Sequence, residues 1–289
     1  MNLEANEITE QHAKEFRSLF INHIKSQTVS GKIGLAMSGG IDSMSIFFSL
    51  IDLKIDFECY TFYQKGYESE DLISSIKYCE QYNIKINLIE LKSDVDSIYR
   101  EIKEIIPFCG KKILKTKVET LRPLRQLFME SKHNVILNGS SADDYQPYKR
   151  KVAILLKEGG DELVIKKGYR RCVDKDEDSF DVLSQEMARF YGVNFVNCYA
   201  SKEIESYFLK FPLKTILTPH KNLVTSAFKD YFDSIGGYRL HSSYQVNSKI
   251  RDYHELLLAS KYNQRNSKAV IGVYNDIAED IKQKQTKLF

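Results

Sequence analysis

The chain has 289 residues, of which 43% are hydrophobic and 28% are charged. This is close to the average for globular proteins and argues against a disordered chain, a collagen-like repeat or a coiled coil. Lys and Arg together number 42 and Asp and Glu 39, a net charge of +3, which does not by itself predict a nucleic-acid or membrane partner.

The cysteines and the N-terminus indicate the compartment. The five cysteines form no CxxC pair, so we expect reduced thiols and no zinc knuckle. The first residues are polar and acidic, and no apolar run reaches the roughly 18 residues of a membrane helix. A soluble, cytoplasmic protein without a membrane partner is therefore expected.

The first part of the chain alternates between predicted helices and strands. Apolar residues at helical spacing predict helices at 8–27 and 70–82 and a buried helix after Gly40. A Lys-rich helix is expected to run to about Lys117, followed by a helix over 121–132 whose first turn accommodates Pro123. Strands are predicted at 33–37, 57–63, 84–89 (an edge strand) and 135–137. This order is typical of an α/β fold with a doubly wound, mainly parallel sheet and right-handed crossovers.

The second half has a different pattern. From Val182 onward apolar residues recur mostly at helical spacing, which predicts a mainly helical region. We place a boundary near Lys151, between a nucleotide-binding core at 1–151 and a substrate or lid region at 152–289. One continuous domain is the alternative.

Residues 38–43, with the sequence SGGIDS, follow the first predicted strand directly and precede a helix. Consecutive glycines let the backbone approach a ligand closely, and the helix N-terminus offers free N–H groups to an anion. Asp42 would repel a bare phosphate, so its presence indicates a bridging Mg²⁺, which prefers carboxylate and phosphate oxygens together. The alternative is a plain glycine turn with Asp42 or Ser43 as the helix cap.

This hexapeptide resembles the SGGxDS loop of the N-type ATP pyrophosphatases (the PP-loop superfamily), which split ATP between the α- and β-phosphates and adenylate a substrate. Three later stretches resemble asparagine synthetases in particular, namely residues 137–145, residues 184–212, and residues 221–231 followed by Arg239. The similarity runs from about residue 8 to residue 252, and its first motif is the most specific one. It implies an adenine nucleotide alpha-hydrolase-like fold.

The resemblance also implies a set of site residues. Asp42 and Asp143 would hold Mg²⁺ on the pyrophosphate, and each follows a strand's carboxyl end, where ligands of doubly wound sheets bind. The residues implied to act in catalysis are Lys221, Arg239 and His241. Those implied to bind ATP are Ala36, Met37, Ser38, Gly39, Gly40, Asp42, Ser43, Phe62 and Gly139. Capping by Asp143 and an ordinary solvated Lys221 or loop His241 are the structural alternatives.

Several positions depart from the asparagine synthetase pattern. Ser140 stands where the family has an acidic residue, Ser141 replaces a glycine, and His241 replaces a lysine that stabilises pyrophosphate. These changes argue against aspartate itself as the substrate. Asn2 stands where a family amidotransferase has its cysteine nucleophile, so ammonia would come from solution or a separate glutaminase, or the nucleophile is an amine.

Three functions follow as hypotheses. The first is an ATP- and Mg²⁺-dependent ligase that adenylates a small-molecule or peptide carboxylate and transfers it to ammonia or an amine. The second is a PP-loop enzyme that modifies a nucleic acid or nucleoside; tyrosines near basic clusters favour it, although solvated helix faces explain those clusters more simply. The third is a non-catalytic ATP-binding relative. The basic clusters comprise Lys111, Lys112, Lys115 and Lys117, and also Lys149, Arg150, Lys151, Lys166, Lys167, Arg170 and Arg171.

Overall fold

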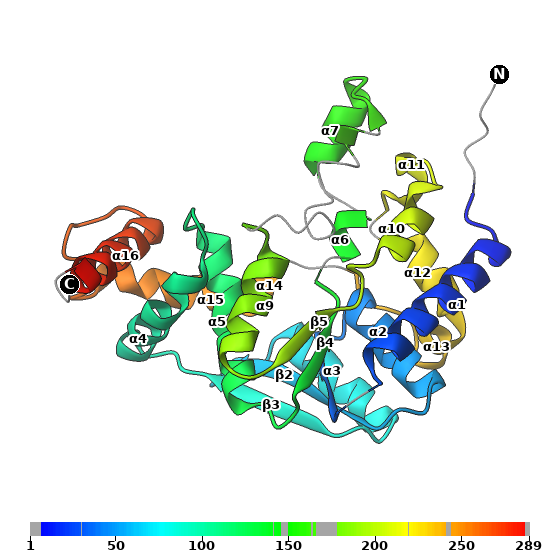
Figure 1. Cartoon of the computed structure of the whole chain (residues 1–289), viewed down its shortest axis with the longest axis horizontal. Coiled ribbons are helices and arrows are strands. Elements are labelled where there is room, and N and C mark those ends of the chain that lie inside the picture. The colour runs from blue at the N-terminus through cyan, green and yellow to red at the C-terminus, as the bar shows by residue number, and fades with distance from the viewer. Residues whose placement is uncertain are drawn as a thin grey trace.

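The structure is a computed structural model (Figure 1). It describes residues 7–29, 31–140, 142–145, 150–162, 164–165, 178–218, 220–240 and 244–286. Across these residues no helix is both long and apolar enough to span a membrane. Cys59, Cys79, Cys109 and Cys198 are free thiols, as predicted, and all four are buried; Cys172 lies outside the described residues.

Five parallel strands form one sheet in the described part of the chain, in the order β3-β2-β1-β4-β5. The α/β class, the parallel sheet and the edge position of β3 are confirmed. A fifth strand was missed, because β5 has just four residues and lies in a region of mostly helical periodicity. The strands are β1 Ile33–Ala36, β2 Phe57–Gln64, β3 Ile86–Leu91, β4 Val135–Asn138 and β5 Asn194–Asn197.

Helices cover both faces of this sheet (Figure 1). Before β5 they are α1 Glu10–Gln27, α2 Ile41–Asp52, α3 Glu70–Gln81, α4 Val95–Ile105, the 3₁₀ turn η1 Ile106–Phe108, α5 Lys115–Glu130, α6 Ala142–Tyr145, α7 Arg150–Lys157 and α9 Phe180–Phe190. After β5 they are α10 Lys202–Leu209, α11 Leu213–Ile216, α12 Asn222–Ala227, α13 Lys229–Ser234, α14 Tyr244–Asn247, α15 Ile250–Glu255, η2 Leu256–Ala259 and α16 Val270–Thr286.

The side-chain alternation along β4 divides the core into two layers. Val135 and Leu137 pack in a cluster with α1, α2 and α10 to α13, whereas Ile136 packs with α4, α5, α9 and α16 on the other face. Because helices cover both faces of the sheet, the central strands are continuous apolar runs.

The region between β3 and β4 differs from the prediction. The Lys-rich helix ends at Ile105 instead of continuing to Lys117, because Pro107 lies in η1 and Gly110 adopts φ +73. The next helix, α5, begins at Lys115, so Pro123 lies inside it rather than in its first turn. The predicted start of this helix, residue 121, was six residues too late.

The strand order indicates a candidate ligand site. The chain builds β1, β2 and β3 in one direction and then returns to place β4 on the other side of β1. The order therefore reverses between β1 and β4, and in open α/β sheets ligands bind beyond the carboxyl ends of the strands at such a point. The sheet includes β5 from beyond the boundary predicted near Lys151, and the division into two domains remains a prediction.

Candidate functional site

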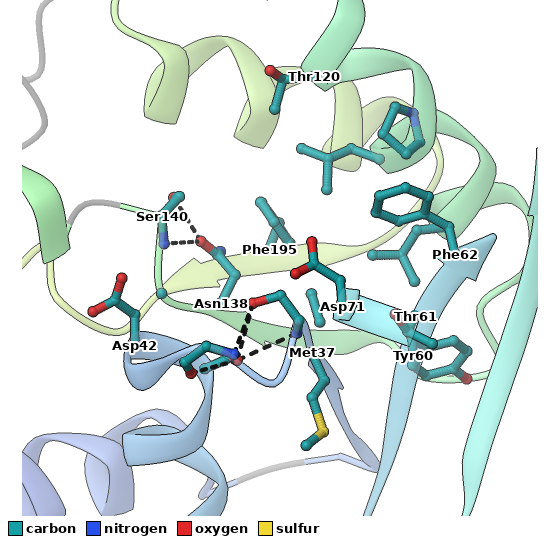
Figure 2. A pocket seen from close by; sticks show the side chains of 18 of the residues that line it. Met37, Asp42, Tyr60, Thr61, Phe62, Asp71, Thr120, Asn138, Ser140 and Phe195 are labelled. Carbon is teal, nitrogen blue, oxygen red and sulfur yellow. Dashed lines mark hydrogen bonds between the residues drawn. The ribbon is translucent and has the colours of Figure 1, made fainter. Parts of the chain in front are cut away.

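A cavity of about 290 Å³ opens at the carboxyl ends of β1, β2 and β4 (Figure 2). Of the residues singled out from the sequence, those that line it are Ala36, Met37, Ser38, Gly40, Asp42, Ser43, Phe62, Gly139, Asp143, Lys221 and Arg239. His241 and Ser141 lie outside the described residues. The loops after β1 and β4 thus meet at one site.

The loop after β1 is held by its own hydroxyl groups. Ser38 N donates to Ser43 Oγ over 3.3 Å, and Ser43 Oγ donates to Gly40 O over 3.1 Å. Gly40 is the N-cap of α2, and among the described residues no side chain caps this helix. Neither Asp42 nor Ser43 therefore caps this helix, and a plain glycine turn stays the alternative to a ligand-binding loop. The N-terminus of α2 lines the cavity, and helix N-termini attract anions.

Two glycines permit the close approach of separate segments. Gly39 adopts φ +67, and a Cβ there would lie 2.5 Å from Cβ of Ser74. Gly39 thus faces α3 and is not one of the cavity-lining residues. A Cβ on Gly139 would lie 3.0 Å from Cβ of Asp42. A side chain at position 139 would therefore push the loop after β4 away from Asp42.

Lys221 bridges the two carboxylates that the sequence predicted as metal ligands. Its Nζ lies 2.5 Å from Asp42 Oδ2 and 2.7 Å from Asp143 Oδ1, and the residue is 2% exposed. Burial alone would lower the pKa of Lys221, but the two carboxylates outweigh it and raise this pKa above its ordinary value. The solvated-lysine alternative is therefore wrong, and Lys221 is a buried cation between two loops.

The residues present fit a magnesium ion that arrives with a nucleotide. Asp42 and Asp143 both contact the ammonium of Lys221, so two carboxylates from separate loops lie close together and carry one negative charge more than this lysine balances. No group of three or more His, Cys, Asp or Glu residues suited to a metal occurs among the described residues. Mg²⁺ usually takes one or two carboxylates together with substrate phosphates, so a two-carboxylate site is sufficient.

Arg239 contacts the glycine loop and also lines the cavity. Its Nη2 donates to Ser38 O over 3.0 Å and forms an ion pair with Asp71, while Nη1 lies 3.3 Å from Glu70 Oε2. Arg239 also forms a backbone bridge with Gly40. These contacts tie the loop to the start of α3, so Arg239 positions the loop.

Asp71 lines the cavity but was not predicted. It lies in the first turn of α3, just past the carboxyl end of β2, where site residues of parallel sheets gather. An acidic residue in a first helical turn is usually explained by the helix dipole alone, which is why this signal was overlooked. Burial raises the pKa of Asp71, and Arg239 offsets this increase in part.

The far end of the cavity is apolar. It is formed by side chains from β2, β3, α5, α9 and β5, of which Phe62 alone was predicted as a nucleotide contact. The residues missed are Tyr60, Ile89, Thr120, Pro123, Leu124, Leu127, Phe180 and Phe195, and Thr61 also lines the cavity. They read as ordinary core residues in the sequence, and the start of α5 and the existence of β5 were not predicted.

A polar network extends from Ser140, one of the positions that depart from the asparagine synthetase pattern. Ser140 Oγ donates to Asn138 Oδ1 over 2.7 Å and accepts from Asn197 Nδ2 over 3.3 Å. Asn197 also donates to Asp181 Oδ1 over 2.9 Å. Burial raises the pKa of Asp181, and Asn197 opposes this. Ser140 and the two asparagines thus link the loop after β4 to the carboxylate of Asp181.

Two lysines of the basic cluster at residues 111–117 form ion pairs within the chain. Lys115 Nζ lies 2.6 Å from Glu255 Oε1, and Lys117 Nζ lies 3.1 Å from Asp178 Oδ1 with only 8% of the residue exposed. Two of the four lysines are therefore engaged elsewhere. The side chains of the other predicted cluster lie outside the described part of the structure.

No protein-family model matches the chain, and no curated protein matches it either. The family resemblance thus rests on the motif residues themselves.

Proposed function

We propose that the protein is an N-type ATP pyrophosphatase of the adenine nucleotide alpha-hydrolase-like fold, acting as an ATP-dependent, amide-forming ligase similar to asparagine synthetases. One observation carries this proposal. Asp42 and Asp143, from loops on either side of a topological switch point, converge on Lys221 beside an uncapped helix N-terminus and a glycine loop.

The two ends of the cavity support one orientation of a bound nucleotide. The loop end offers N–H groups, Lys221 and two carboxylates, which suit Mg²⁺-bound phosphates. The other end offers Phe62, Leu124 and Phe195, which suit a planar base. ATP in this orientation has its β- and γ-phosphates at residues 38–43 and its α-phosphorus toward the loop after β4.

The proposed reaction has two steps. A carboxylate oxygen of the substrate attacks the α-phosphorus, the bond to the β-phosphate oxygen breaks, and pyrophosphate leaves. Ammonia or an amine then attacks the acyl carbon, the acyl–oxygen bond breaks, AMP leaves, and the nitrogen loses a proton to solvent. Lys221 would donate to the phosphate oxygens as negative charge accumulates on the leaving pyrophosphate. Mg²⁺, when bound, supplies charge neutralisation on the phosphates.

The carboxylate substrate would bind beside the loop after β4, where described residues provide uncharged polar groups. Asn138 and Ser140 line the cavity there, in place of the acid that the family uses. We therefore propose a small-molecule or peptide carboxylate other than aspartate as the substrate, with ammonia, an amine or a separate glutaminase as the nitrogen source.

The products of ATP cleavage test this function. The protein is incubated with ATP, Mg²⁺, ammonium and pools of carboxylic acids and amines, and nucleotides and phosphates are separated by chromatography. The proposal expects AMP and pyrophosphate. ADP and phosphate would refute the mechanism, and tight ATP binding without any pyrophosphate exchange would favour the non-catalytic alternative.

The nucleic-acid alternative is tested separately, by polynucleotide binding across a salt series. Affinity that falls steeply with salt would support it. The ion pairs of Lys115 and Lys117 argue against it.

A further inference from the structure

Asp71 lines the cavity. Figure 2 shows it between Asp42 on one side and Phe62 on the other, with its carboxylate turned into the cavity. The residue is 5% exposed. A buried carboxylate facing a cavity needs hydrogen-bond donors, since desolvation of its charge is costly.

The contacts of Asp71 fix its distance from the phosphate loop. One nitrogen, Arg239 Nη2, donates both to Asp71 Oδ1 and to Ser38 O. The Asp71 carboxylate and the loop backbone therefore share one hydrogen-bond donor, and this shared nitrogen keeps them close together. Arg239 and Asn247 both lower the pKa of Asp71 as hydrogen-bond partners. A carboxylate has about four lone-pair sites, so these two partners leave it able to accept further donors.

Resting on the proposed function, we infer that Asp71 binds the ribose hydroxyls of the nucleotide and makes the site selective for ribonucleotides. With phosphates at residues 38–43 and the base at the apolar end, the pentose must lie between them, where Asp71 stands. Its hydroxyls are the donors that this segment of a nucleotide offers. Carboxylates accept ribose hydroxyls in dinucleotide-binding α/β folds for the same chemical reason.

The charge of Asp71 also orients the nucleotide. A phosphate placed against this carboxylate would be repelled, whereas a hydroxyl is attracted. Arg239 holds the carboxylate in place from the side of α3, so the acceptor is preorganised before the nucleotide arrives.

Calorimetric titration of the full chain with ATP, 2′-deoxy-ATP and 3′-deoxy-ATP tests this inference, each with Mg²⁺. Each hydroxyl that Asp71 accepts should be worth about ten-fold or more in affinity, because hydrogen bonds to charged groups are strong. At least one deoxynucleotide should therefore bind about ten-fold more weakly than ATP. In Asp71→Ala the three dissociation constants should converge to within about two-fold.

Glu70→Gln is the matched control. Glu70 pairs with the same guanidinium, but its side chain is 67% exposed and does not line the cavity, so the preference for ATP should persist. If Asp71→Ala fails to fold, the nearly isosteric Asp71→Asn should show a reduced preference. Equal binding of all three nucleotides by the unaltered protein overturns the ribose assignment alone. Binding of none of them overturns the proposed function and this inference together.

Discussion

At the loop end of the cavity, charged side chains arrive from separate segments of the chain, after β1, after β4 and before α12. The other end is lined by apolar side chains of the sheet and α5, which also belong to the core. The loop end is held by ion pairs such as Lys221 with Asp42, whereas the apolar end depends on packing. Substitutions at the loop end should therefore affect chemistry, and those at the apolar end should affect nucleotide affinity.

The largest effect is expected from Asp42→Ala. Loss of this carboxylate removes one of two groups that would hold Mg²⁺, and pyrophosphate release should fall on the order of 10³-fold. Product chromatography measures the rate. Asp56→Ala, an exposed residue beyond the other end of α2, is the control and should leave the rate unchanged. Unchanged turnover in Asp42→Ala would remove the metal role.

Lys221→Met should have the next largest effect. It leaves Asp42 and Asp143 facing each other without a cation, so turnover should fall about 10²-fold and the free energy of unfolding by about 2–4 kcal/mol. Urea unfolding measures the second quantity. Lys229→Met removes a lysine whose side chain is 70% exposed and should change neither. A variant as stable as the original protein would show that the buried bridge is not structural.

Leu124→Ala addresses the apolar end. Shortening this side chain removes contact with the base, so ATP should bind about ten-fold more weakly while the rate at saturation stays within about two-fold. Titration calorimetry and saturation kinetics separate the two. Met129→Ala, at a 50% exposed position of the same helix, is the control. A fall in saturated rate without a change in affinity would contradict the proposed division of roles.

The smallest effect on the site is expected from the protonation of His254, a buried residue of α15. Its Nδ1 lies 2.6 Å from the Tyr274 hydroxyl, and burial, with smaller contributions from Arg122 and Lys115, lowers its pKa well below 6.5. Below that pH the unfolded chain binds a proton that the folded chain excludes. The contribution of His254 to the free energy of unfolding should therefore be fully present above pH 6.5. It should be lost as the pH decreases below 6.5, by at most about 1.4 kcal/mol per pH unit.

The pH dependence is measured by urea unfolding between pH 7 and pH 5, together with ATP affinity. His254→Gln should show a shallower decrease in stability, since it removes the titrating group. Equal slopes for the two proteins would exclude His254 as the cause.

The sequence predicted the loop end better than the apolar end for a physical reason. Residues 38–43 form a contiguous motif whose glycines and hydroxyls act locally, and Asp143 and Lys221 were indicated by the family resemblance. Leu124 and Phe195 carry no chemical signal of their own. Their place in the cavity depends on where α5 begins and on the pairing of β5 with β4, which are set by tertiary packing.

Asp71 is an intermediate case. Its position after a parallel strand was visible in the sequence, but its cavity-facing orientation depends on Arg239, 168 residues away. The strands of the first half were predicted because continuous apolar runs between turn residues signal buried parallel strands.

A crystal structure with a non-hydrolysable ATP analogue and Mg²⁺ tests the central claim most directly. We expect the β- and γ-phosphates against residues 38–43, the metal bound by carboxylate oxygens of Asp42 and Asp143, and the base beside Phe62 and Leu124. An analogue bound elsewhere, or in the reverse orientation with its base at the loop, would contradict the account.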